Sequence, residues 1–322
     1  MKILIAYDGS NCSDLALDDL TKAGLPAKGE ALVMSVAEVW LPPKNGLAES
    51  NGYKQSPYIE EIIQKHYEKG KKAVAEAATF AKHAQNKLKK LLPKWKVKTE
   101  ATYGSPGWEI LDKAASFQPG LIVVGSHGHS LINRLLLGSI SQKVLSEAHC
   151  SVRVARGKPS SNNSPQKIII GFDGSDGAKA AVEAVASRSW QNDVQIRLVA
   201  VTDLIIPSAI GRFIPPVAEW VEVEIKTERE WIEKMAECAI KMLTNKGFAT
   251  ELRIIAGNPK QVLVEEATRW KADSIFVGAN AYGSKLERFL IGSVASAVAS
   301  RANCSVEVTR KPATQQLVVN LN

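Results

Sequence analysis

The residues best suited to chemistry lie in the glycine-rich stretch 125–139, GSHGHSLINRLLLGS. This stretch follows the apolar run 121–124 and leads into a helix-like segment, and it is about twice as long as the two to six residues that usually connect a strand to a helix. Glycines let a ligand approach the backbone closely. Gly138-Ser139 opens a helix, whose free N–H groups and positive dipole end favour a phosphate. The stretch therefore predicts a site for a phosphorylated ligand.

The chain repeats itself, so the elements that position this stretch occur twice. Residues 2–10 match residues 167–175, and residues 134–156 align with residues 288–310 without a gap, 12 of the 23 positions being identical. A Pro-, Ser- and Asn-rich segment between the copies is typical of a linker. We therefore expect two domains, at 1–157 and 166–311, separated by a linker at 157–166 and followed by a segment outside the repeat at 312–322.

Each half alternates short apolar runs with segments of helical periodicity. Strands that are apolar on both faces and alternate with helices indicate a parallel sheet covered on both sides, which is an α/β fold. Ser105-Pro106 and Asn258-Pro259 each supply a helix N-cap followed by proline at the first helical position. In the first half we expect strands at 3–7, 31–36, 97–103, 121–124 and 151–155, and helices at 13–23, 59–91 (with His66 packed on its apolar face), after 105 and at 139–148.

Ligands of such sheets bind beyond the carboxyl ends of the strands, where the strand order reverses. Asp8 follows the first strand, Val36 ends the second and Gly125 follows the fourth. The corresponding residues of the second half are Asp173, Val201 and Gly278. An aspartate in an Asp-Gly-Ser sequence also shapes a turn well, so a purely local role for Asp8 and Asp173 is the alternative.

The spacing Gly125-x2-Gly128-x9-Gly138-Ser139 resembles the G-x2-G-x9-G-[ST] pattern of nucleotide-binding members of the universal stress protein family. The opening strand ending in Asp8-Gly9-Ser10 and the closing Cys150-Ser151-Val152 are similar to that family too. The resemblance covers both halves and implies two tandem flavodoxin-like, Rossmann-like domains, each a five-stranded parallel sheet of strand order 3-2-1-4-5. It implies that Asp8 and Val36 contact adenosine, that Gly125 and Gly128 contact ribose and phosphate, and that Gly138 and Ser139 hold the phosphates, with His129 and Ile140 beside them.

The second half departs from this pattern. Its stretch begins Gly278-Ala279-Asn280-Ala281-Tyr282-Gly283, so Ala281 replaces the second glycine, and the distance to Gly292-Ser293 is one residue longer. Gly283 is the candidate replacement. Asp173, Val201, Gly292 and Ser293 are retained, so we expect the phosphate end of the second site to be usable and the first half to bind better.

The resemblance implies an adenine nucleotide as ligand; we expect ATP with Mg²⁺, with AMP or ADP as alternatives. No nucleophile, base and orienting group are spaced as a triad, and His127 and His129 fit loop residues flanking phosphate better than catalysts. Arg134 and Arg288 either screen phosphate charge or form salt bridges.

The predicted role of the protein is a stress-response regulator or switch. The alternatives are a slow ATP hydrolase on the same fold and a non-binding scaffold that works through surface loops, such as 41–57 and 206–216.

The net charge, the apolar runs and the cysteines indicate which classes of partner and which compartment to expect. The 322 residues carry a net charge of +8. This mild excess could favour an anionic ligand or nucleic acid, but it fits a solvated helix face better, so we expect no nucleic-acid partner. No apolar run is long enough to span a bilayer. Four scattered cysteines form no CxxC pair and no metal cluster, which is typical of free thiols in a reducing compartment. With no signal peptide at the start, we expect a cytoplasmic protein. Family resemblance further suggests that the two halves form a pseudo-dimer through strands 152–154 and 306–308, and that two chains could pair as a homodimer.

Overall fold

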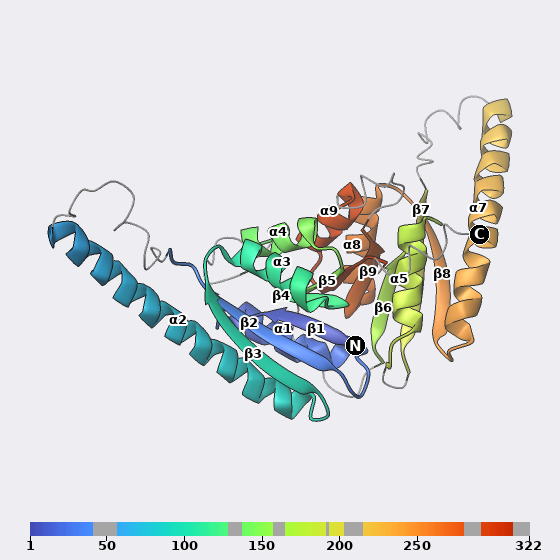
Figure 1. Cartoon of the computed structure of the whole chain (residues 1–322). Coiled ribbons are helices and arrows are strands. Elements are labelled where there is room, and N and C mark those ends of the chain that lie inside the picture. The colour runs from blue at the N-terminus through green and yellow to red at the C-terminus, as the bar shows by residue number, and fades with distance from the viewer. Residues whose placement is uncertain are drawn as a thin grey trace, which may run out of the picture.

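The computed structural model describes residues 1–40, 57–127, 137–156, 165–190, 193–202, 215–279 and 291–311. The greater part of the predicted linker, the greater part of the surface loops at 41–57 and 206–216, and the segment after residue 311 lie outside these ranges. Within them the chain folds as two α/β halves joined into one sheet (Figure 1).

The first half follows the predicted alternation of strands and helices, with ends that differ by one to a few residues. Its elements are β1 (Lys2–Ala6), α1 (Asn11–Asp19) with a 3₁₀ turn (Leu20–Lys22), β2 (Glu30–Ala37), α2 (Pro57–Leu91), β3 (Lys96–Tyr103), α3 (Pro106–Phe117), β4 (Leu121–Gly125), α4 (Ser139–Glu147) and β5 (Ser151–Ala155).

The second half repeats the same order. Its elements are β6 (Lys167–Gly171), α5 (Asp176–Ala186), β7 (Gln195–Thr202), α7 (Pro215–Thr244), β8 (Ala249–Ala256), α8 (Pro259–Trp270), β9 (Ser274–Gly278), α9 (Ser293–Arg301) and β10 (Ser305–Thr309).

The ten strands of the described residues belong to one sheet, in the order β3-β2-β1-β4-β5-β10-β9-β6-β7-β8. The order within each half is the predicted 3-2-1-4-5, and the pairs within each half are parallel. The halves join where β5 pairs antiparallel with β10, with Val154 opposite Val306 and Val152 opposite Val308. The prediction that these two strands pair is confirmed, and the pairing removes two exposed edges from the sheet.

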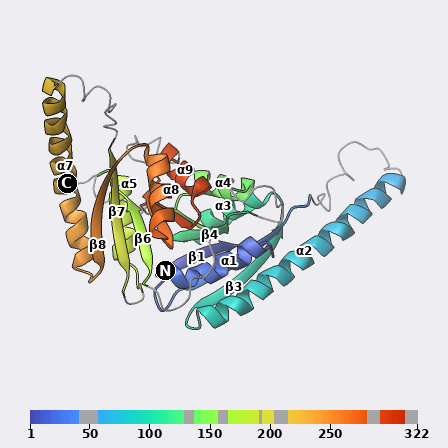
Figure 2. The same cartoon turned by 180° about the vertical axis from the view of Figure 1, so that it is seen from behind.

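The helices cover both faces of this sheet (Figures 1 and 2). On one face, α3 and α4 pack beside α8 and α9, and a single apolar core runs across both halves. On the other face the core is divided: α1 and α2 cover the first half, and α5 and α7 cover the second. The antiparallel junction is therefore apolar on one side only.

Charged side chains fill the junction on the divided face. Arg153 and Glu307, directly opposite each other in the β5–β10 pair, are both fully buried. The Arg153 guanidinium donates to both carboxylate oxygens of Asp19, at 2.6 and 3.1 Å, and lies 3.5 Å from Glu307. Arg188 donates to both carboxylate oxygens of Glu307. Two acids thus balance two bases between the halves, with Arg153 and Glu307 fully buried and Asp19 and Arg188 largely so.

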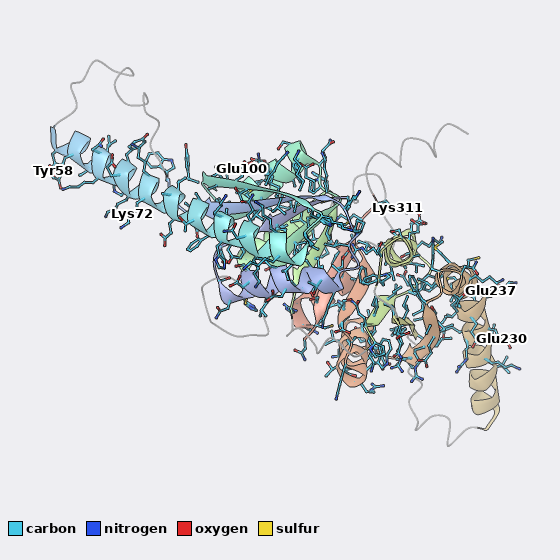
Figure 3. All side chains as sticks on the ribbon, turned by 90° about the horizontal axis from the view of Figure 1, so that it is seen from below. Tyr58, Lys72, Glu100, Glu230, Glu237 and Lys311 are labelled. Atoms are coloured by element: carbon cyan, nitrogen blue, oxygen red, sulfur yellow. The ribbon has the colours of Figure 1, made fainter. Side chains whose placement is uncertain are left out.

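The long helices α2 and α7 extend beyond the sheet (Figures 1 and 3). The periodicity of 59–91 predicts one buried face along the whole of α2, and this is wrong for its first third. Burial begins at Gly70 and continues through Ala77, Ala81, Ala84 and Leu88, whereas His66, predicted to be packed, is exposed. The early turns lie past the end of the sheet, with Tyr58 at the far tip, and the apolar side chain of Ile62 is exposed there (Figure 3).

The predicted helix starts are found. Pro106 and Pro259 occupy the first turn of α3 and α8, with Ser105 and Asn258 as N-caps. Only Asn258 uses its side chain, accepting a hydrogen bond from the Lys260 backbone N–H at 3.0 Å. None of the helices in the described residues is long and apolar enough to cross a membrane.

Candidate functional site

The structure gathers the predicted adenosine residues at one edge of the first-half sheet. Ala6 pairs with Met34 and Ile5 pairs with Val123, so continuing this register brings Asp8, Val36 and the end of β4 to the same level. Gly171 pairs with Val199 in the second half, which brings Asp173 level with Val201 in the same way. Both halves therefore present the same carboxyl edge, where ligands of open α/β sheets bind.

Asp8 shapes the turn that begins this edge. Its Oδ1 accepts hydrogen bonds from the Ser10 backbone N–H at 3.0 Å and from the Ser10 hydroxyl at 2.6 Å. Gly9, between them, has φ +79°, a conformation that favours glycine. Asp173 accepts the equivalent bond from the Ser175 N–H at 3.0 Å. The local role that the sequence leaves open is thus present in both halves, and a ligand contact of either carboxylate stays a prediction.

The loop after the fourth strand of each half closes with the same hydrogen bond. The Gly138 N–H donates to the Ser126 carbonyl at 2.9 Å, and the Gly292 N–H donates to the Ala279 carbonyl at 2.6 Å. The extra residue of the second copy therefore falls inside the loop and leaves its base unchanged. The loop residues among the predicted set, Gly128, His129 and Gly283, lie outside the described residues, as do Arg134 and Arg288.

Each of these loops ends at the start of a helix. Gly138 is the N-cap of α4, with extended backbone, and no side chain of the described residues caps the helix. Gly292 stands at the same point of α9, again without a side-chain cap. The N–H groups of the first turn have no partners within a helix. The backbone N–H groups of Ser139 and Ile140 in α4, and that of Ser293 in α9, are thus placed to bind an anion at the positive end of the helix dipole.

Ser141 is a residue of this site that the motif does not contain. Its hydroxyl donates to the Gly125 carbonyl at 2.7 Å and so ties the first turn of α4 to the end of β4. The second half has Ala295 at this position and cannot form the bond. The only signal in the sequence is this difference between the copies.

Gly125 has a packing role that sequence reasoning missed. A Cβ at Gly125 would lie 3.1 Å from the carbonyl carbon and oxygen of Cys12, in the first turn of α1. At Gly278 it would lie 2.3 Å from the carbonyl carbon of Gly177, in α5. Both glycines let a strand end against helix backbone. Contact between Gly125 and a ribose therefore stays a prediction, beside a structural reason for the residue.

His127 continues the edge beyond β4. Its Nδ1 lies 3.2 Å from the Ser126 hydroxyl, and its Nε2 is buried and has no hydrogen-bond partner among the described residues. Burial, and secondarily the charge of Arg156, lowers the pKa of His127. The lowered pKa favours the neutral imidazole, which offers a ligand a hydrogen bond.

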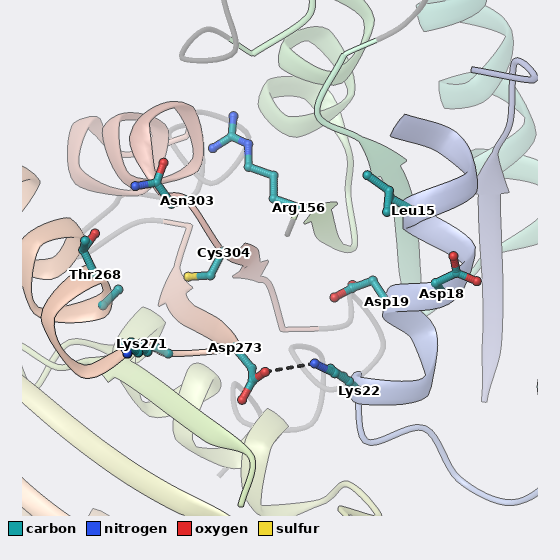
Figure 4. A pocket seen from close by; sticks show the side chains of 12 residues that line it. Leu15, Asp18, Asp19, Lys22, Arg156, Thr268, Lys271, Asp273, Asn303 and Cys304 are labelled. Carbon is teal, nitrogen blue, oxygen red and sulfur yellow. Dashed lines mark hydrogen bonds and ion pairs between the residues drawn. The ribbon is translucent and has the colours of Figure 1, made fainter. Parts of the chain in front are cut away.

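The described residues also contain free cysteines and a cavity between the halves. All four cysteines are free, and no three His, Cys, Asp or Glu side chains in the described ranges gather as metal ligands. A cavity of about 290 Å³ lies between the halves, lined by Asp19, Lys22, Arg156 and Asp273 among others (Figure 4). Lys22 and Asp273 form a salt bridge of 3.1 Å across it. None of the predicted ligand-binding residues is among its described lining.

Comparison with known proteins gives the family. The model of the universal stress protein family matches residues 1–156 and again residues 165–310. The chain belongs to the universal stress protein family.

Its similarity to other members spans both halves. A universal stress protein of Mycobacterium tuberculosis is 24% identical over 317 residues, which are 96% of this chain and 97% of that one. The crystal structure of a universal stress protein from Archaeoglobus fulgidus is similar over 97% of each chain, with a TM-score of 0.58 and 22% identity, and it shows the same fold. A family protein from Arabidopsis thaliana, solved with AMP bound, matches 47% of this chain and 95% of its own, with a TM-score of 0.31 and 20% identity.

Proposed function

We propose that this universal stress protein binds an adenine nucleotide at the carboxyl edge of its first half. The observation that carries the proposal is the N-terminus of α4, which no side chain of the described residues caps and which follows the glycine-rich loop after β4, the strand that pairs with β1. The ligand set is Asp8, Val36, Gly125, Gly128, His129, Gly138, Ser139 and Ile140.

Each part of this edge suits one part of a nucleotide. The N–H groups at Ser139 and Ile140 supply donors and a positive field for phosphates. Val36, level with Asp8, offers backbone groups and an apolar side chain to a base. ATP is the proposed ligand, with AMP and ADP as weaker candidates. Mg²⁺ would enter with the triphosphate, which supplies its oxygen ligands.

The second half retains the same phosphate end. Gly292 and Ser293 open α9 as Gly138 and Ser139 open α4, and Asp173 and Val201 share a level as their counterparts do. Ala295 replaces Ser141, and so the link between the helix start and the fourth strand is lost. We propose that Asp173, Val201, Gly278, Gly283, Gly292 and Ser293 form a weaker second site.

Titration with ATP and Mg²⁺ tests both statements. Gly138→Val places a branched side chain at the N-cap of α4 and should abolish binding in the first half. Gly292→Val makes the same change at α9 and should remove only the weaker binding, so it is the matched control. Equal losses in the two variants would contradict the ranking of the halves, and an unchanged titration of Gly138→Val would contradict the site.

We propose further that the bound nucleotide acts as a signal in a stress response and is turned over slowly or not at all. Family membership supports the stress-response part. Asp8, the nearest acidic candidate, is assigned to the adenosine end of the ligand and not to the phosphates, so it is a poor group to orient an attacking water. Single-turnover hydrolysis of ATP with Mg²⁺ tests this. A rate of about 1 s⁻¹ or more, lost in His127→Ala/His129→Ala, would make the protein an enzyme.

A further inference from the structure

Two arginines leave the sheet at equivalent points of the two halves. Arg156 directly follows β5, and Arg310 directly follows β10. Each is fixed by a serine of the opposite half: the Arg156 N–H donates to the Ser305 hydroxyl at 3.0 Å, and the Arg310 N–H donates to the Ser151 hydroxyl at 3.0 Å. The repeat thus preserves both the arginine and its anchor.

The side chains of these arginines cross the junction. Arg156 donates to the carbonyls of Ala302 at 2.8 Å and Ser300 at 3.2 Å, at the end of α9. Arg310 donates to the carbonyl of Leu145 at 2.7 Å, in the last turn of α4, and lies 3.4 Å from that of Cys150. Each arginine therefore caps the last helix of the other half.

Burial makes these contacts important. The last carbonyls of a helix have no partner within it, and a cation is favoured at this negative end. Burial lowers the pKa of both guanidinium groups. Each guanidinium donates to backbone carbonyls at the end of the opposite helix, so the negative end of that helix dipole faces its positive charge. Figure 4 shows Arg156 at the edge of the cavity between the halves, with Asn303 and Cys304 of the second half lining the same cavity.

The two capped helices are those that begin at the candidate phosphate sites. Each has nine residues, and at a rise of 1.5 Å per residue each is about 14 Å long. A rigid rod of this length carries a tilt at its last turn directly to its first. Fixing the carboxyl end of α4 therefore fixes the direction in which the N–H groups of Ser139 and Ile140 point.

We propose that Arg310 and Arg156 are positioning residues that make each nucleotide site depend on the opposite half of the chain. Arg310 holds α4 for the first-half site, and Arg156 holds α9 for the second-half site; this inference rests on the proposed function. Because coupling of two equilibria is reciprocal, nucleotide bound at α4 also strengthens the contact of Arg310 with that helix. Nucleotide bound at one site thereby stabilises the arginine contact at the junction of the halves.

Hydrogen exchange on the full chain tests the crossed contacts without any ligand. Arg310→Ala should speed amide exchange in α4 and leave α9 unchanged, whereas Arg156→Ala should do the reverse. Lys22→Ala is the matched control, because it removes a side-chain contact between the halves that touches neither helix end. Faster exchange only in the half that carries the substitution, or the same pattern in Lys22→Ala, would overturn the inference.

Titration with ATP and Mg²⁺ then tests the positioning role. In a Gly292→Val background, which reports the first half, Arg310→Ala should weaken binding about 3- to 10-fold, the range expected for loss of a favourable helix-end charge. Arg310→Lys should restore part of it, and Lys22→Ala should change it less than about twofold. Loosening of α4 with unchanged affinity would overturn the positioning role. If the parent chain binds no ATP, the proposed function fails, while the exchange experiment still decides whether the arginines act across the junction.

Discussion

Replacing the glycine that ends the fourth strand separates its packing role from any ligand role. Gly125→Ala adds a Cβ that lies 3.1 Å from the backbone of Cys12, a distance at which one side must move by a few tenths of an ångström. Gly278→Ala adds one 2.3 Å from the backbone of Gly177, which no side-chain rotation relieves. Gly120→Ala is the control, since its nearest contact is the Lys2 carbonyl at 3.8 Å.

The expected magnitudes follow from these distances. Overpacking costs about 1–3 kcal/mol, so Gly125→Ala should lose about 1 kcal/mol of the free energy of unfolding and Gly278→Ala about 3 kcal/mol. Gly120→Ala should be neutral or gain up to about 1 kcal/mol, because alanine restricts the unfolded chain.

Equilibrium urea unfolding without nucleotide measures all three variants. The predicted order of stability is Gly120→Ala, then Gly125→Ala, then Gly278→Ala. A Gly278→Ala protein as stable as the parent chain would refute the packing argument. Loss of ATP binding in Gly125→Ala at unchanged stability would show that the glycine serves the ligand alone.

Three further predictions concern buried groups. Glu307→Ala leaves Arg153 and Arg188 without their shared acid and should lower the free energy of unfolding in urea by about 3–5 kcal/mol. The control Glu251→Ala, at a half-exposed carboxylate, should lower it by less than about 1 kcal/mol. Equal losses in the two variants would contradict the buried network. Because the pKa of His127 is lowered in the folded chain, the unfolded chain binds the proton more tightly. The free energy of unfolding should therefore fall as the pH drops below about 6.5, and His127→Gln should flatten that fall. An identical pH profile in the variant would contradict the lowered pKa of His127. Burial raises the pKa of the Cys150 thiol to about 11 and that of Cys304 to about 12, while Cys238 is exposed. Iodoacetamide at pH 8 should therefore label Cys238 first, which peptide mass spectrometry measures. Rapid labelling of Cys304 in the folded chain would contradict its burial.

Much of the fold was predictable because its signals are local and occur twice. Apolar runs such as 121–124 mark buried strands, and the prolines at 106 and 259 mark helix starts. The β5–β10 junction followed from family resemblance and from the alternation of residues in both strands. The exposure of His66 was missed because periodicity shows which face of α2 is apolar, but not how far the sheet extends beneath it.

The candidate site was predictable in its positions and less so in its contacts. The carboxyl edge with Asp8 and Val36 follows from the order of strands. The packing of Gly125 on α1, the bond from Ser141 and the crossing of Arg310 to α4 depend on which elements meet in space. A repeated arginine shows that a position matters in both copies, but the opposite half that it contacts becomes visible only when β5 and β10 are paired.

The central claim is that an adenine nucleotide lies at the carboxyl edge of the first half with its phosphates on the first turn of α4. A crystal structure of the full chain grown with ATP and Mg²⁺ tests this most directly. The account predicts phosphate oxygens within hydrogen-bond distance of the backbone nitrogens of Ser139 and Ile140, and the adenine beside Val36. A nucleotide bound elsewhere, for example in the cavity between the halves near Lys22 and Arg156, or none at millimolar ATP, would contradict it.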